Sequence, residues 1–258
     1  MSILGDAMRN IQLIIEYDGT NYCGWQIQKK GVGVQEKIGA SIEQITQRSA
    51  KVIGSGRTDA GVHALGQSAN FITESTIPIS RIPMALNSNL PRDIRIIQAK
   101  ERSIEFHSRY HAIGKIYQYK ILNNQYGSAL DRNKVFHVSH TLNVIEMKRA
   151  AAVFLGTHDF TAFSSANSSI KNKIRTIMKS HIEVHGDQIL YTVQGSGFLY
   201  NMVRIIVGTL IGVGMGKIDP ESIPDIIQSK NRINAGPTAA AHGLYLQEVL
   251  YENIDTPG

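Results

Sequence analysis

Residues 174–194 have the sequence IRTIMKSHIEVHGDQILYTVQ, which predicts two strands joined by a tight turn. Apolar and β-branched residues are frequent in Ile174–Val184 and Gln188–Gln194, and the turn at His185–Asp187 contains a glycine. Such a short connection joins antiparallel neighbours, because parallel strands need a crossover of a dozen or more residues. The stretch therefore favours an antiparallel sheet.

The rest of the chain alternates strand and helix patterns around this hairpin. Further strands are expected at Arg9–Tyr17, Val62–Phe71, Ile94–Ala99, Lys115–Leu122 and Leu244–Leu250, and helices at Val34–Ser49, Ser80–Asn89, Asn143–Leu155, Leu199–Met215 and Glu221–Ser229. Antiparallel pairs mixed with helices are typical of an α+β fold with its helices on one face of the sheet. We expect two halves, residues 1–107 and 108–258.

The charge balance of the chain is basic. Its 258 residues include 27 lysines and arginines against 21 acidic residues, which gives a net charge of +6 and a pI near 9.3. A basic surface favours a polyanionic partner such as nucleic acid. A charge that only keeps the protein soluble is an equally good explanation, so composition alone leaves both open.

Composition also limits the kinds of site. A single cysteine, Cys23, excludes an internal disulfide framework and a cysteine-based zinc site, and it favours a reducing compartment, the cytoplasm. The nine histidines lack metal-ligand spacing, so no metal is expected. The first residues, MSILGDAM, lack the pattern of a signal peptide, and Met8 is an alternative start. Ile205–Met215 is far shorter than the roughly 20 apolar residues of a membrane span.

The loop sequence GSGRTDAGVHA, residues 54–64, presents Asp59 between a strand and an extended segment. Its glycines permit sharp turns, but the spacing of a phosphate-binding loop or a dinucleotide fold is missing. Asp59 therefore has two explanations, a structural turn aspartate or a catalytic carboxylate acting as a nucleophile. For an isolated turn aspartate the structural explanation is the commoner one.

Arg204 adds weight to the catalytic explanation of Asp59. It lies in MVRIIVG, residues 202–208, at or beside the buried face of an expected helix. A buried arginine needs a partner, and Asp59 is one candidate among several. Such a pair would keep the carboxylate ionised, as a nucleophile requires. The alternatives are that Arg204 reaches solvent or braces a loop.

Two tyrosines, Tyr117 and Tyr119, share one face of the strand KIYQYKIL, residues 115–122. A tyrosine exposed on a sheet can stack on a nucleobase. More often such a residue belongs to the core, which is the explanation that the residues alone favour.

Taken together, six blocks resemble the bacterial tRNA pseudouridine synthase A family. They are YDGTNYCGWQ (17–26), GSGRTDAGVHALGQ (54–67), KIYQYKI (115–121), GTHDFTAFS (156–164), FLYNMVRIIVGTL (198–210) and GLYL (243–246). The blocks occur in the order of the family and span most of the chain. GRTDAGVHA followed by MVR is the specific part of the resemblance, whereas GLYL alone is weak.

The resemblance implies an isomerase without a cofactor that converts uridine to pseudouridine at positions 38–40 of the tRNA anticodon stem-loop. It also implies two ferredoxin-like halves that share a mostly antiparallel sheet with a basic cleft between them. The implied assembly is a cytoplasmic homodimer.

The resemblance also assigns site residues. Asp59 is the expected nucleophile, Tyr117 stacks on the target base, and Arg204 pairs with the aspartate. Arg57 is implicated in flipping the nucleotide, and Leu244 lines the base pocket. Lys115 stands where the family usually has arginine, which loses the planar fork for bidentate phosphate contact.

Three questions stay open at this stage. The carboxylate could attack C6 of the base or C1′ of the ribose. Substrate selection by the loop Ser168–Lys173 does not follow from the resemblance. Two other function classes compete: a non-catalytic RNA-binding module in which Asp59 only braces its loop, and a small-molecule acid–base enzyme.

Overall fold

A computed structural model describes residues 8–165 and 170–252. Met8 is the first described residue, so the segment before this alternative start lies outside, as does Ser168–Ser169 of the variable loop. Within the described part, no helix is long and apolar enough to cross a membrane.

The chain folds into two compact units. The first contains the residues up to Ile113 and those from Leu246 onward, and the second contains Gly114–Tyr245. The expected halves, 1–107 and 108–258, differ from these units because the last strand returns to the first unit. No local motif marks that return, since the partners of a terminal strand are decided by long-range pairing.

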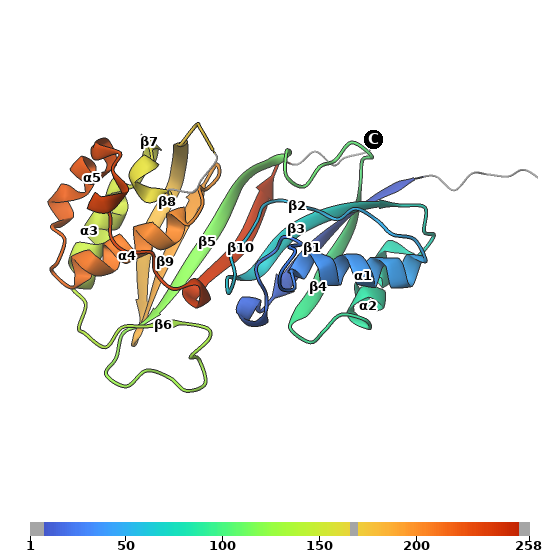
Figure 1. Ribbon diagram of the computed structural model, residues 1–258, viewed down its shortest axis with the longest axis horizontal. Coiled ribbons are helices and arrows are strands. Elements are labelled where there is room, and N and C mark those ends of the chain that lie inside the picture. The colour runs from blue at the N-terminus through green and yellow to red at the C-terminus, as the bar shows by residue number, and fades with distance from the viewer. Residues whose placement is uncertain (1–7, 166–169, 253–258) are drawn as a thin grey trace, which may run out of the picture. The chain divides into compact units, whose positions relative to one another are not determined.

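The first unit is an antiparallel sheet with helices (Figure 1). Its elements are β1 (Arg9–Tyr17), α1 (Val34–Thr46), β2 (Ile53–Gly54), β3 (His63–Thr73), α2 (Ile82–Asn87), β4 (Ile94–Arg102) and most of β10 (Leu244–Tyr251). The strand order is β4-β1-β3-β10, and β2 pairs with β3. The order of elements up to β4, β-α-β-β-α-β, is that of a ferredoxin-like unit.

The central strand β1 is buried on both faces. Asn10 donates from its Nδ2 to the carbonyl oxygen of Phe106 at 2.8 Å, so the 103–108 segment covers one face. Ile11 and Leu13 alternate with the polar residues Asn10 and Gln12, so they lie on the other face, where they are fully buried. The helices α1 and α2 of this unit are joined by the Ser41 hydroxyl, which donates to the Leu86 carbonyl oxygen at 3.0 Å.

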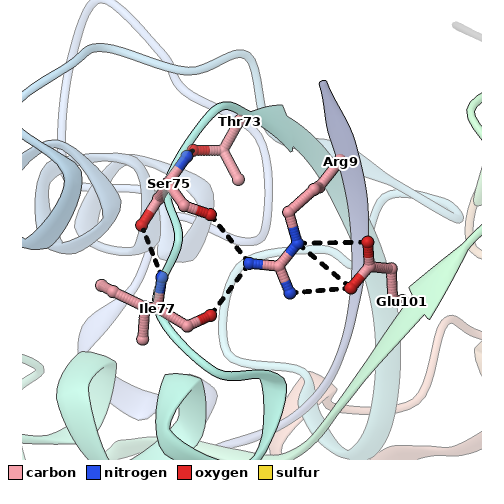
Figure 2. A network of polar contacts seen from close by, with 5 residues as sticks. All are labelled: Arg9, Thr73, Ser75, Ile77 and Glu101. Atoms are coloured by element: carbon pink, nitrogen blue, oxygen red, sulfur yellow. Dashed lines mark hydrogen bonds and ion pairs between the residues drawn. The ribbon is translucent and has the colours of Figure 1, made fainter. Parts of the chain in front are cut away.

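A polar network at Arg9 fastens the edge of this sheet (Figure 2). The guanidinium donates to the Glu101 carboxylate on β4, with 2.7 Å between Nη2 and Oε2, and to the carbonyl oxygens of Ser75 and Ile77 at 2.7 and 2.9 Å. Arg9 holds the pKa of Glu101 below its usual value, chiefly through this hydrogen bond. One side chain thus joins β1, β4 and the segment after β3.

The second unit contains the hairpin that favoured an antiparallel sheet. Its elements are β5 (Ala112–Leu122, from Gly114 on), β6 (Phe136–His137), α3 (Val144–Val153), β7 (Gly156–Asp159), β8 (Ile174–His185), β9 (Gln188–Gly195), α4 (Met202–Gly214) and α5 (Ile223–Ser229). The strand order is β5-β9-β8-β7, and His185 pairs with Gln188 at the turn. These strands are antiparallel neighbours, while β6 lies parallel to β5.

Helix α4 forms the core of the second unit. Its residues from Ile205 to Gly214 are all buried, so the apolar stretch that was too short for a membrane span forms a core helix. A Cβ on Gly208 would lie 1.7 Å from the carbonyl oxygen of Pro237, so only glycine lets this segment pass the helix. The Ser180 hydroxyl of β8 donates to the Ala151 carbonyl oxygen of α3 at 2.6 Å.

The fold class is confirmed as α+β with a mostly antiparallel sheet and helices. The predicted hairpin and the strands at Arg9–Tyr17 and Lys115–Leu122 are present. The helix predicted at Leu199–Met215 begins only at Met202, because Asn201 adopts a left-handed conformation with φ 61°. The short strands β6 and β7 were not predicted from the sequence.

Candidate active site

The loop that carries Asp59 connects β2 to β3 and is fastened by backbone hydrogen bonds. The amide of Trp25 donates to the Thr58 carbonyl oxygen at 3.1 Å, immediately before Asp59. The amide of Val62 donates to the carbonyl oxygen of Asp59 itself at 3.1 Å. The Asp59 side chain is half-buried. The backbone of the candidate nucleophile is thus held on both sides.

Hydrogen bonds between buried side chains also hold this loop. The hydroxyls of Tyr17 and Thr58 share a hydrogen bond of 2.7 Å, and both residues are buried. Burial raises the pKa of Tyr17 well above its usual value, so the phenol stays protonated. Ser55 donates to Oε1 of Gln67 at 2.7 Å at the start of the loop. These contacts leave the loop little freedom to move.

Gly24 is a point of close contact between the loop and the 17–26 segment. Its φ of +96° is left-handed, and a Cβ there would lie 2.4 Å from the carbonyl oxygen of Thr58. Both facts require glycine. The two sequence blocks that resemble the family, 17–26 and 54–67, are therefore packed against each other in the first unit.

Arg57 projects from this loop and is exposed. Its Nε donates to Oε1 of Gln26 at 2.7 Å. Sequence reasoning quoted Gln26 only as the last letter of YDGTNYCGWQ and gave it no role. Its place at the end of a recognised block was the signal that could have identified it.

Tyr117 lies on β5 in the second unit and is 8% exposed. Its ring meets the edge of Phe198 in a T-shaped contact with 5.2 Å between ring centroids. Tyr119, on the same strand face, is fully buried and donates from its hydroxyl to the Ala240 carbonyl oxygen at 2.8 Å. Tyr119 is thus a core residue, while the stacking role expected for Tyr117 stays a prediction.

Arg204 projects from the first turn of α4 and is half-buried. Its Nε donates to the carbonyl oxygen of Ala239 at 2.7 Å, and its Nη1 donates to Oδ1 of Asn201 at 2.9 Å. The amide of Ala239 donates back to the Arg204 carbonyl oxygen at 3.0 Å. These bonds join Arg204 to the segment at Ala239, and the role that the resemblance assigns to Arg204 stays a prediction. Asn201, which had no predicted role, is part of this arrangement.

Leu244 begins β10 and is 5% exposed. It follows the 3₁₀ turn Ala241–Gly243, where Gly243 packs so closely on Tyr119 that a Cβ would lie 2.6 Å from its ring. Desolvation lowers the pKa of His242 in this turn, and the charge of Arg204 lowers it further. Leu244 thus follows a turn that begins two residues after Ala239, the residue to which Arg204 bonds.

The five predicted site residues fall into two groups. Asp59 and Arg57 belong to the first unit, and Tyr117, Arg204 and Leu244 belong to the second. Each group is held by contacts within its own unit. The pairing of Asp59 with Arg204 stays a prediction.

Chemically, the first group offers a carboxylate and a guanidinium on one tight loop. A carboxylate of fixed position suits nucleophilic attack or general base chemistry. Within residues 8–165 and 170–252, no group of three or more histidine, cysteine or acidic side chains could hold a metal ion.

Comparison with known proteins gives one consistent family. The family described as tRNA pseudouridine synthase matches residues 13–111 and 150–252. Tyr117 falls in the gap between these segments, and the other four predicted residues lie inside them.

Full-length relatives carry the same description. The chain is 54% identical over 244 residues to tRNA pseudouridine synthase A of Acetivibrio thermocellus, covering 95% of this chain and 100% of that protein. It is 50% identical, with the same coverage, to tRNA pseudouridine synthase A of Thermoanaerobacter sp. (strain X514). A crystal structure of a Cbf5-Nop10-Gar1 complex matches 78% of this chain and 45% of its own, with 15% identity and a TM-score of 0.35.

Proposed function

Because the chain belongs to the tRNA pseudouridine synthase family and is an isomerase, we propose that its substrate site is the anticodon stem-loop of tRNA. In this proposal it converts uridine to pseudouridine at positions 38–40. Asp59 is the nucleophile, and no cofactor takes part. Family membership supports the reaction, and the resemblance of the site blocks supports the finer assignments.

The reaction balances without an oxidant or a reductant. The bond between C1′ and N1 breaks, the uracil rotates, a bond forms between C1′ and C5, and the C5 proton leaves while N1 gains one. A carboxylate can start this sequence by adding to C6 of the base or by displacing the base from C1′. Both routes use the same residue, so the proposal does not depend on the choice.

One observation supports Asp59 most directly: its loop is fastened on both sides of the carboxylate. Bonds from Trp25 to Thr58 and from Val62 to Asp59, each 3.1 Å, fix the backbone. The buried hydrogen bond between the hydroxyls of Tyr17 and Thr58 fixes the side chain that precedes Asp59. The Val62 bond is the usual bond of a β-turn, whereas the Trp25 bond ties the loop to a separate segment, and a nucleophile gains rate from a fixed position.

The other four residues surround the base in the proposal. Arg57 takes the place of the flipped nucleotide, Tyr117 stacks on the target uracil, Leu244 lines its pocket, and Arg204 balances the charge of Asp59. Removing a base from its stack costs a few kcal/mol, which stacking and the Arg57 contact offset.

The proposed partners follow from the same family membership. The net charge of +6 agrees with a tRNA substrate. We also propose a homodimer that acts in the cytoplasm, with the tRNA in a basic cleft. Size-exclusion chromatography with light scattering measures the oligomeric state directly.

Carbodiimide mapping of pseudouridine in total tRNA tests the function. Cells with and without this protein are compared, and cells carrying it on a plasmid serve as the restored control. We expect signals at positions 38–40 to vanish in its absence and to return with the plasmid. Signals lost from another arm or from ribosomal RNA would refute the assigned position, and no lost signal would refute the substrate.

A further inference from the structure

Asn201 has an unusual backbone for its place in the fold. Within residues 8–165 and 170–252, the non-glycine residues with positive φ are Gln47, Asn201 and Lys230. Gln47 and Lys230 follow the last residues of α1 and α5, where left-handed residues are common. Asn201 instead precedes the first residue of α4, where a capping residue is normally extended. Its conformation therefore needs a separate explanation.

The side chain of Asn201 is also used differently from that of a helix cap. Asparagine is a favoured cap, yet the Asn201 side chain makes no capping hydrogen bond to the backbone of α4. Its Oδ1 instead accepts from Nη1 of Arg204 at 2.9 Å, and its Nδ2 donates to Oγ of Ser165 at 2.8 Å. The amide thus bonds to two side chains rather than to the backbone of the helix.

The orientation of this amide follows from its partners. A guanidinium can only donate, so the oxygen of the amide must face Arg204 and the nitrogen must face Ser165. Ser165 is fixed in turn, because its backbone amide donates to the Tyr200 carbonyl oxygen at 3.2 Å. The chain segment around Ser165 thus sets the direction of the Asn201 amide.

Arg204 is consequently held at two edges of its planar head. Asn201 contacts Nη1, and the Ala239 carbonyl oxygen accepts from Nε at 2.7 Å. Two contacts on different nitrogens fix the plane of a guanidinium, which is rigid and always charged. Removal of the Asn201 contact leaves Nε bonded but takes away the bond that helps to set the plane of the guanidinium.

We propose that Asn201 is a positioning residue, which turns the guanidinium of Arg204 to the direction in which it acts during pseudouridine formation. This inference rests on the proposed function, in which Arg204 balances the charge of the nucleophile. The left-handed backbone places the amide beside Arg204. Backbone conformations that cost energy persist where the surrounding contacts fix them, often at functional sites.

The test substitution is Asn201→Gly, because glycine accepts the left-handed backbone and removes only the amide. We expect a melting temperature close to that of the unsubstituted protein. We expect kcat for pseudouridine formation in tRNA to fall about 10- to 100-fold, with KM changed less than about threefold, as for the loss of a hydrogen bond to a charged group. Gln47→Gly, at a left-handed site in the other unit, should leave both constants unchanged.

Repeating Asn201→Gly in an Arg204→Lys variant distinguishes a positioning role of Asn201 from a general structural role. In Arg204→Lys, the amide has no planar head to orient, so adding Asn201→Gly should cost less than about threefold. Ser165→Ala keeps both backbones and should lower kcat in the same direction by about threefold. It also serves as the test if Asn201→Gly does not fold.

Two results would overturn the inference. One is a kcat of Asn201→Gly, or of Ser165→Ala where the first does not fold, equal to that of the unsubstituted protein. The other is an equal cost of Asn201→Gly in both backgrounds. A different result, no pseudouridine formed by the unsubstituted protein, would refute the proposed function itself, so the two failures are distinguishable.

Discussion

The two groups of candidate site residues are held in different ways. The Asp59 loop is fastened mainly by backbone hydrogen bonds to the 22–25 segment and by a buried hydroxyl pair. The guanidinium of Arg204 bonds to the amide side chain of Asn201 and to the carbonyl group of Ala239. Backbone bonds survive most side-chain changes, whereas the bond between Asn201 and Arg204 is lost when either side chain is replaced. We therefore expect the Asp59 loop to lose its geometry only where a substitution forces its backbone to move.

Gly24→Ala, which leaves the five site residues intact, should have a larger effect than Tyr17→Phe or His242→Gln. The new Cβ would lie 2.4 Å from the Thr58 carbonyl oxygen at a φ of +96°, so the loop must shift. We expect a loss of roughly 1–3 kcal/mol of stability and about a 100-fold loss of kcat. Thermal unfolding and single-turnover assays measure the two.

Gly39→Ala is the matched control, since its Cβ would meet nothing within 4 Å. It lies in α1, where alanine should stabilise slightly. Wild-type activity in Gly24→Ala would show that the loop tolerates the shift and would contradict the account of how it is held.

Tyr17→Phe should have a smaller effect on the same loop. It removes the partner of the buried Thr58 hydroxyl, 2.7 Å away, and should cost about 1–3 kcal/mol of stability. Because the backbone bonds remain, kcat should fall only about three- to tenfold. Tyr251→Phe, which loses a 2.7 Å bond from its hydroxyl to the Ser108 carbonyl oxygen, is the matched control. Equal kcat losses in both variants would mean that the effect is general destabilisation.

The smallest expected effect is on the pH dependence of stability and involves His242 in the second unit. Burial lowers the pKa of His242 below its ordinary value of 6.5 in the folded protein. The unfolded chain then binds more protons between the two pKa values, so stability falls as the pH drops below about 6.5. His242→Gln should reduce the fall of the melting temperature between pH 7 and pH 5 by about 1–2 °C.

His185→Gln, at the exposed end of β8, is the control for this measurement. An unchanged pH slope in His242→Gln would show that His242 does not carry the expected linkage. Activity at pH 7.5 should remain in both variants, since neither residue is assigned to the site.

Sequence periodicity predicted the fold where local patterns are strong. The hairpin of β8 and β9, the strand β1 and the helix α1 all have clear alternation or a helical spacing of apolar residues. Strand β7 has only four residues and exists because it pairs with β8, so its local sequence carries no such signal. The start of α4 was missed for a related reason: Asn201 leaves the helix to contact Arg204 and Ser165, which are tertiary contacts.

The candidate site residues came from the family resemblance, and their roles stay predictions. The resemblance supplied Asp59, Arg57, Tyr117, Arg204 and Leu244, because these residues lie in recognisable blocks. Residue patterns could not reveal that Gln26 accepts from Arg57 or that Asn201 accepts from Arg204. Both depend on how separate segments pack, and only the structure shows that.

The most direct test of the central claim is single-turnover pseudouridine formation with Asp59→Ala, measured together with tRNA affinity. The control is Asp187→Ala, which removes an exposed turn aspartate at the end of the β8–β9 hairpin. The account predicts that Asp59→Ala binds tRNA within about threefold of wild type while product formation falls to the uncatalysed background, a loss of at least about 10⁴-fold. Asp187→Ala should retain wild-type rates. Measurable turnover by Asp59→Ala would contradict the claim that Asp59 is the nucleophile.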